Sequence, residues 1–298
     1  MTTVADSPSA VPTRASSHRW VEVLLDVLKY GLLIVLSFSF LFPIYWMFSS
    51  ALKDDPQVFT VPPVMIPNPM FWENFPNAWT LHPFTTFAFN TVFRYVLPAV
   101  SITVVSSTFI AYGFSKIRWP GRDILFYLAL TTMMMPWAVK MIPVFIGLKW
   151  LGWLDTYRFW TVTALFGHPY FIFMLRQFFR TIPEELSESA RLDGASELTI
   201  LVRIIVPLSY AALAVVALFR FMWAWNDYLG PLLFIRTEEN YPIALGIELL
   251  DVGQNYTCKR CVPHLMAASS LATIPIIILF FFAQKTFIEG INLTGTKG

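Results

Sequence analysis

The 298-residue chain is 56% hydrophobic and only 13% charged, whereas roughly a quarter of the residues in soluble domains are charged. Too few polar side chains remain to cover a soluble globule, so a lipid bilayer is the expected solvent. The 28 Phe, 11 Trp and 11 Tyr residues fit this environment, because Trp and Tyr favour the headgroup region and Phe the hydrocarbon. A net charge of only +2 argues against a nucleic-acid partner.

The N-terminal residues 1–19 are rich in Ser, Thr, Ala and Pro. This composition predicts a disordered cytoplasmic tail, followed by one transmembrane domain over residues 20–298. The first apolar stretch runs without a charge from Tyr30 to Leu52. It is too long for the core of a cleaved signal peptide, and we expect it to span the membrane.

Six stretches are apolar over the roughly 20 residues that a membrane-spanning helix needs: residues 30–52, 92–115, 122–140, 159–176, 204–228 and 262–284. These stretches are too long and too uniform for the alternating strands of a membrane barrel, so an all-α fold with six transmembrane helices is predicted. An even number of spans places both termini on one side. Twelve of the 21 Lys and Arg residues then lie on the side of the termini, against eight on the other, with Arg220 inside a span. The positive-inside rule therefore favours cytoplasmic termini.

A polar segment with strong local helix signals, residues 181–207, separates the fourth and fifth expected spans. Thr181 and Glu184 have the spacing of a capping box, and Pro183 suits a first helical turn. Gly194 suits the left-handed conformation that ends a helix. A second helix then runs through Pro207 into the fifth span, so the segment is predicted to be a rigid helix-turn-helix. Such an element converts a push from the cytoplasm into a tilt of the spans.

This segment resembles the EAA loop of binding-protein-dependent ABC importer permeases, in which Glu-Ala-Ala is followed by Gly, Ile and Leu-Pro at fixed spacing. The corresponding residues here are Glu188-Ser189-Ala190, Gly194, Ile204 and Val206-Pro207. Ser189 and Val206 depart from the pattern by small changes. Further matches at residues 151–157, 175–185, 225–227 and 289–298 resemble the carbohydrate-type permeases similar to the maltose transporter subunit MalG.

The resemblance implies a permease subunit of the bacterial inner membrane that transports a carbohydrate, of the di- or oligosaccharide class. The implied partners are a second homologous permease subunit, two ATP-binding cassette ATPase subunits, an extracytoplasmic sugar-binding protein that meets residues 236–261, and membrane lipid. The residues implied to couple to the ATPase are Glu185, Glu188, Ala190, Asp193, Gly194, Ala195, Ile204 and Pro207. C-terminal residues implied to reach the ATPase interface are Gly295, Lys297 and Gly298.

Catalytic motifs are missing from the sequence, which has no Gly-x-x-x-x-Gly-Lys-Ser/Thr phosphate loop, no His-Glu-x-x-His and no Gly-x-Ser-x-Gly. We therefore expect no enzymatic activity, cofactor or metal site in this chain, and ATP hydrolysis by a separate partner. The alternative is an ion-driven secondary transporter or channel subunit. It is disfavoured because no Asp or Glu lies well inside an expected span.

Candidates for a substrate path cluster near the end of the fifth expected span: Arg220, Trp223, Trp225, Asn226 and Asp227. Arg220 follows Ile204 by 16 residues, which corresponds to roughly 24 Å along a helix and places it in the outer third of the membrane. Its side chain either snorkels to the headgroups or faces the path, where it pairs with Asp227 or binds sugar. Cys258 and Cys261 also leave two interpretations: a loop disulfide or idle thiols, and redox or metal chemistry.

Overall fold

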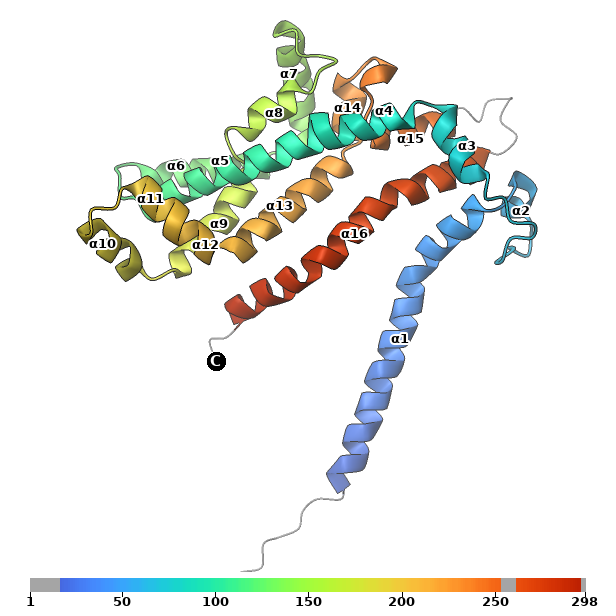
Figure 1. Ribbon diagram of the computed structural model, residues 1–298, viewed down its shortest axis with the longest axis horizontal. Coiled ribbons are helices and arrows are strands. Elements are labelled where there is room, and N and C mark those ends of the chain that lie inside the picture. Colours follow the sequence, from blue (N-terminus) through green and yellow to red (C-terminus); the bar gives the residue numbers. More distant parts are fainter. Residues whose placement is uncertain (1–16, 253–260, 296–298) are drawn as a thin grey trace, which may run out of the picture.

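A computed structural model describes residues 17–252 and 261–295 of the chain, and every regular element in these residues is a helix (Figure 1). The shorter helices outside the coupling segment include α2 (Asp55–Phe59), α3 (Asn74–Leu81), α14 (Leu229–Phe234), η4 (Glu238–Asn240) and α15 (Ile243–Val252). The longer or central helices are α1 (Ser17–Ala51), α4 (Phe84–Phe89), η1 (Asn90–Val96), α5 (Leu97–Ser115), α6 (Arg122–Thr131), η2 (Thr132–Met134), α7 (Trp137–Trp150), α8 (Arg158–Ala164), α9 (Pro169–Thr181), α13 (Tyr210–Trp225) and α16 (Cys261–Gly295). Between α9 and α13 lie α10 (Glu184–Leu192), α11 (Glu197–Ile200), η3 (Leu201–Ile205) and α12 (Val206–Leu208).

Three continuous helices in the described residues are long and apolar enough to cross a membrane: Trp20–Ala51, Phe84–Ser115 and Val262–Gln284. Two bent pairs pass the same test together, which raises the number of spans to as many as five by length and composition. The predicted all-α membrane fold is therefore confirmed. The first, second and sixth expected stretches lie within continuous helices, and the other three do not.

Prolines divide the remaining three stretches. Arg122–Met134 and Trp137–Trp150 meet at 100°, because Met135 is extended before Pro136, as residues that precede proline commonly are. The stretch expected at 159–176 is split into α8 and α9 by Gly167, at φ 68°, and by an extended His168 before Pro169. Glu197–Leu208 and Tyr210–Trp225 meet at 81°, with the bend at Ser209 just beyond Pro207. The stretches over 122–140, 159–176 and 204–228 are thus each broken into shorter helices.

The two π-helical segments, η1 and η3, each end just before a proline. Leu97 N–H bonds to the carbonyl of Val92 just before Pro98, and Val206 N–H bonds to the carbonyl of Leu201 just before Pro207. Proline lacks the N–H that would continue an α-helical ladder. The wider turn supplies alternative partners in the residues that lead up to each proline, so the helix continues through it.

The first helix begins at Ser17, inside the stretch predicted as a disordered tail; the other residues of that stretch lie outside the described part. The helix therefore begins before the uncharged stretch that starts at Tyr30. It includes Glu22 and Asp26, which stand among Val and Leu residues that are compatible with a helix. In Figure 1, α1 leans away from the other helices and approaches them at its C-terminal end, where it packs with α16. Its middle is exposed apolar surface, which in a membrane protein faces lipid or another subunit.

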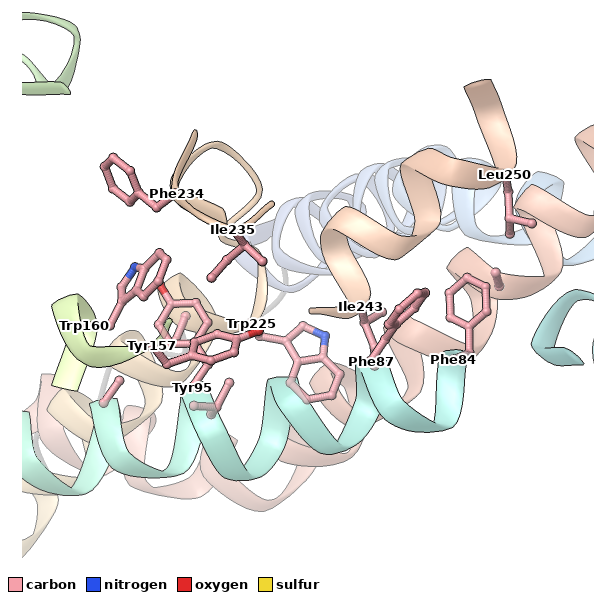
Figure 2. Packing of buried hydrophobic residues seen from close by; sticks show 14 of the residues in the cluster. Phe84, Phe87, Tyr95, Tyr157, Trp160, Trp225, Phe234, Ile235, Ile243 and Leu250 are labelled. Carbon is pink, nitrogen blue, oxygen red and sulfur yellow. The ribbon is translucent and has the colours of Figure 1, made fainter. Parts of the chain in front are cut away.

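The larger hydrophobic cluster joins the outer parts of the helices. Phe87, Tyr95, Trp160, Trp225 and Phe234 belong to it, and Figure 2 shows Tyr95, Trp160 and Phe234 at one end of the cluster and Phe87 at the other. A Cβ at Gly246 would lie 2.3 Å from the Phe87 ring, so only glycine lets α15 approach α4 this closely. A second cluster surrounds the α10 end of α5, α9 and α13.

Asp155 fastens the loop after α7 to the segment after α14. Its carboxylate accepts hydrogen bonds from the N–H groups of Arg236 and Thr237, at 2.9 and 3.1 Å, and from the Thr237 hydroxyl at 2.8 Å. Burial acts to raise the pKa of Asp155, but these bonds together with one from Asn240 outweigh it and hold the pKa below its usual value. The residue also adopts φ 61°, a conformation that Asp and Asn tolerate better than most residues.

We predict that Asp155→Asn lowers the thermal unfolding temperature of the purified chain at pH 7, because Asn tolerates the backbone conformation but lacks the charge. The folded-state pKa is depressed, so the charge-dependent stability is present above the unfolded pKa of about 3.9 and is lost as the pH falls through the folded value. The difference from wild type should therefore narrow on acidification, as measured by thermal melts from pH 7 down to the acid limit of the detergent sample. A difference that is independent of pH contradicts the assignment.

Candidate coupling loop and central cavity

The helix α10 ends in a motif that fixes the direction of the chain after it. Gly194 has φ 80°; its N–H bonds to the carbonyl of Arg191 at 3.0 Å, and the N–H of Ala195 bonds to the carbonyl of Ala190 at 2.9 Å. This is the Schellman pattern. Nothing lies within 4 Å of a Cβ at Gly194, so glycine is required there for its backbone conformation and not for space. The expected left-handed turn at Gly194 is confirmed.

The predicted capping box at the start of this helix does not form. The Thr181 hydroxyl bonds back to the carbonyl of Phe178, and Pro183 precedes α10 without a side-chain cap. Glu184 instead faces two cations: its carboxylate lies 3.1 Å from Lys116 Nζ and 3.6 Å from Arg191. The Glu184 side chain, which the capping-box spacing assigned to a local cap, therefore pairs with Lys116 and Arg191 instead.

These contacts belong to a closed ring of side chains, which we call the anchor ring: Tyr112, Lys116, Glu184, Arg191 and Glu197. Arg191 Nε donates to Glu197 at 2.7 Å, and the Tyr112 hydroxyl donates to the same carboxylate at 2.5 Å. Lys116 is buried and also donates to the carbonyl of Ile182 at 2.7 Å. Since Tyr112 is on α5 and Lys116 caps that helix, the ring fastens α10 and α11 to α5. Sequence reasoning missed it, because no local pattern pairs residues so far apart in the chain.

The other side of α10 is open. Glu185, Glu188, Asp193 and Gly194 are exposed, and Leu192 is 89% exposed. Ala190 and Ala195 pack against the second hydrophobic cluster, together with Ile204. Pro207 is exposed and lies in α12. The residues expected to couple thus form two groups. Those on and just after α10, together with Pro207, are exposed, whereas the two alanines and Ile204 pack against the hydrophobic cluster.

Some of the residues expected to contact the ATPase or the binding protein lie at the edge of the described residues or outside them. Lys297 and Gly298 fall outside the described residues, and Gly295 is the last residue of α16. Most of the loop with Cys258 lies outside as well, so neither interpretation of Cys258 and Cys261 is tested. The outer segment 236–261 contains η4 and α15 in its described part.

A cavity of about 420 Å³ lies between α5, α8 and α13. Aromatic side chains provide much of its wall: Tyr95, Trp137, Phe159, Trp160, Trp223 and Phe234. The polar and charged groups are Thr103, Thr163, His168, Arg220 and Asp227. The volume lies within the range of about 300–1,000 Å³ typical of small-molecule sites.

Asp227 is held firmly at this cavity. One carboxylate oxygen accepts hydrogen bonds from the Tyr95 hydroxyl and, at 3.2 Å, from Trp160 Nε1; the other accepts the N–H of Gly230 at 3.0 Å. A Cβ at Gly230 would come within 2.8 Å of the carboxylate, so glycine permits this approach. Tyr95 and Trp160 are further site residues that sequence reasoning missed, since they come from elements distant in the chain.

Three of the five residues expected along a substrate path, Arg220, Trp223 and Asp227, line this cavity. Arg220 Nε lies 3.3 Å from the Thr103 hydroxyl, and none of the ion pairs found among the described residues joins it to Asp227. Arg220 therefore faces the cavity.

The other two expected path residues have structural contacts instead. Trp225 is buried and donates to the carbonyl of Ala272 on α16 at 3.1 Å, and Asn226 donates to the carbonyl of Met222 at 2.8 Å. Neither lines the cavity.

Comparison with known proteins connects these features. A family model described as "Binding-protein-dependent transport system inner membrane component" matches residues 107–292, which include α10, the anchor ring and most of the cavity. The chain belongs to this family. As a family member, the permease is an inner membrane component of a binding-protein-dependent ABC importer, as its sequence motifs implied.

Named relatives align over most of the permease. The sn-glycerol-3-phosphate transport system permease protein UgpE of Yersinia enterocolitica is 32% identical over 274 residues, covering 90% of this chain and 96% of UgpE. The arabinooligosaccharides transport system permease protein AraQ of Bacillus subtilis is 31% identical, covering 89% and 93%. A chain in the crystal structure of a bacterial ABC transporter involved in the import of the acidic polysaccharide alginate superposes with a TM-score of 0.79 at 26% identity, covering 92% and 99%.

We call residues 181–207 the coupling loop. There, we predict that Gly194→Val leaves membrane insertion intact but weakens co-purification of ATPase subunits or uncouples ATP hydrolysis from uptake. A β-branched residue at positive φ is strained, by more than the roughly 1 kcal/mol expected for Ala, and redirects the chain after α10. Gly113→Val is a matched control, because it is equally open to a Cβ but lies in a helix without positive φ. Full, coupled uptake by Gly194→Val contradicts a coupling role.

Proposed function

We propose that the permease forms, with a second homologous permease, the membrane path of an importer that takes a carbohydrate from an extracytoplasmic binding protein. Two separate ATPase subunits supply the energy by docking on the exposed face of α10. The observation that carries this proposal is a shared framework: α5, α9 and α13 connect the coupling loop to the cavity.

At one end, α5 contributes Tyr112 and Lys116 to the anchor ring, while α9 and α13 flank the coupling loop. At the other end, the same helices reach the cavity, α5 through Thr103 and α13 through Arg220 and Trp223, with His168 at the start of α9. A displacement of α10 therefore moves helices that line the cavity. This is the mechanical requirement for alternating access, in which nucleotide selects between two packings that differ by a few kcal/mol.

The chemistry of the cavity suits a sugar. Aromatic faces stack on the C–H faces of sugar rings, while Arg220, Asp227 and the Thr hydroxyls supply hydrogen bonds to the ring hydroxyls. Arg220 and Asp227 are the cationic and anionic side chains in the wall, and their charges cancel. UgpE and AraQ are named for sn-glycerol-3-phosphate and arabinooligosaccharides. Of these two substrate classes, the balanced charge favours a neutral di- or oligosaccharide.

Both termini of the permease are placed in the cytoplasm by this proposal. In Figure 1 the C-terminal end of α16 lies toward the same end of the molecule as α10, where ATPase subunits would dock. The basic residues, which are more numerous on that side of the sequence-predicted spans, favour the same orientation.

The test is transport by the reconstituted complex. Arg220→Ala and Trp223→Ala should each reduce sugar uptake by roughly tenfold or more, because each loses a hydrogen-bonding or stacking contact with the substrate. ATPase activity stimulated by the binding protein should stay largely intact, since neither residue touches the anchor ring.

Matched controls are Arg158→Ala and Trp150→Ala, which alter the same residue types at exposed positions outside the cavity; Trp150 is 93% exposed. The controls should transport normally. Normal uptake by both cavity variants, measured with labelled saccharide in sealed vesicles, removes the cavity from the path.

A further inference from the structure

A second cavity, strongly polar, lies at the α10 end of the helices. Its volume is about 560 Å³, and we call it the basic cavity. Its charged lining residues are Lys116, Arg118, Arg122, Asp123, Arg176, Arg180 and Glu184. Five cations and two carboxylates leave a net charge of +3 in one cavity of a chain whose total is only +2.

Three of the cations are held by the protein. Arg176 donates to the carbonyl of Phe114 at 3.0 Å and to Asp123 at 2.9 Å. Arg122 also contacts Asp123, and Lys116 belongs to the anchor ring. Both carboxylates are therefore already engaged by these three cations.

Arg118 and Arg180 are different. Both are exposed, and within the described residues neither side chain makes a hydrogen bond or an ion pair. Two guanidinium groups thus face one cavity with their donors available. Guanidinium groups bind phosphate oxygens through paired, charge-assisted hydrogen bonds.

Apolar surface adjoins the basic cavity along α6. Tyr127 lines the cavity, while Ile124, Leu125 and Leu128 on the same helix are 68%, 51% and 55% exposed. Trp119 lies in the short loop between α5 and α6 and donates to the carbonyl of Gly113. Tryptophan favours the headgroup level of a bilayer, so we expect the cavity mouth at the depth of lipid phosphates and α6 beside acyl chains.

We propose that the basic cavity binds the phosphodiester headgroup of an anionic phospholipid, with Arg118 and Arg180 contacting the phosphate and the acyl chains lying along α6. Basic pockets between membrane helices on the cytoplasmic side are a general form of lipid headgroup site. Lys116 and Glu184 line both this cavity and the anchor ring. A bound headgroup therefore lies against the contact that fastens α10 to α5. The site does not depend on which substrate the permease transports.

The experiment measures binding of phosphatidylglycerol and of phosphatidylcholine with identical acyl chains to the purified full chain by native mass spectrometry. Phosphatidylglycerol should bind more tightly to wild type. Each arginine near an anionic surface contributes a factor of about 5 in affinity, so Arg118→Gln with Arg180→Gln should weaken phosphatidylglycerol binding by about 25-fold. If the wild-type chain binds the two lipids equally, the proposal is overturned, whatever the variants show.

The matched control is Arg158→Gln with Arg203→Gln, which removes the same charge from two exposed arginines outside the cavity and should bind phosphatidylglycerol like wild type. Equal weakening by both double variants indicates a nonspecific charge effect and overturns the site. Inorganic phosphate at matched concentration should not displace the lipid. If it does, the cavity binds a free anion and the lipid proposal is overturned. The measurement is repeated on the complex with its ATPase subunits, where loss of the lipid would assign the cavity to a protein contact instead.

Discussion

The buried ammonium of Lys116 is the constraint on which the coupling end of this permease depends. A charge removed from water is tolerated only where partners replace its hydration, and here the Ile182 carbonyl and the Glu184 carboxylate supply them. Both partners lie at the start of the coupling loop, so satisfying one charge at the end of α5 also fixes the position of α10. Arg191, Glu197 and Tyr112 close the ring from the other end of that helix.

A rigid attachment of this kind explains how a surface loop affects a distant cavity. The exposed face of α10 is free for a partner, while its other side cannot move without α5. The helices α9 and α13 continue directly from the coupling loop, and their far ends contribute His168, Arg220 and Trp223 to the cavity. On the proposed function, coupling and substrate contact would both belong to these three helices.

Prolines divide the membrane helices near these functional regions. The bends at Pro136 and around Ser209, and the extended His168 before Pro169, break stretches whose hydropathy is continuous. The break before Pro169 places His168 at the cavity. The π-helical turns before Pro98 and Pro207 are a milder consequence of the same missing N–H.

The sequence by itself determined the membrane environment, the all-α class, the family and the left-handed turn at Gly194. The family came from the resemblance of the segment 181–207 to a known motif, and the other three follow from local composition, periodicity and spacing, which are properties of neighbouring residues. Three of the five residues expected along the substrate path also line the cavity: Arg220 and Trp223 on α13, and Asp227 just beyond the end of that helix.

Only the tertiary structure decided the rest. Hydropathy does not register the direction of a chain at a proline, so it did not show that three of the expected spans are broken into shorter helices. Glu184 was assigned to a local cap but pairs with Lys116, 68 residues away. Trp225 and Asn226 were expected on the path, but contacts with Ala272 and Met222 engage them elsewhere. For Glu184 and Trp225 the deciding partners, Lys116 and Ala272, are brought close only by folding, and spacing along the sequence contains no record of that distance.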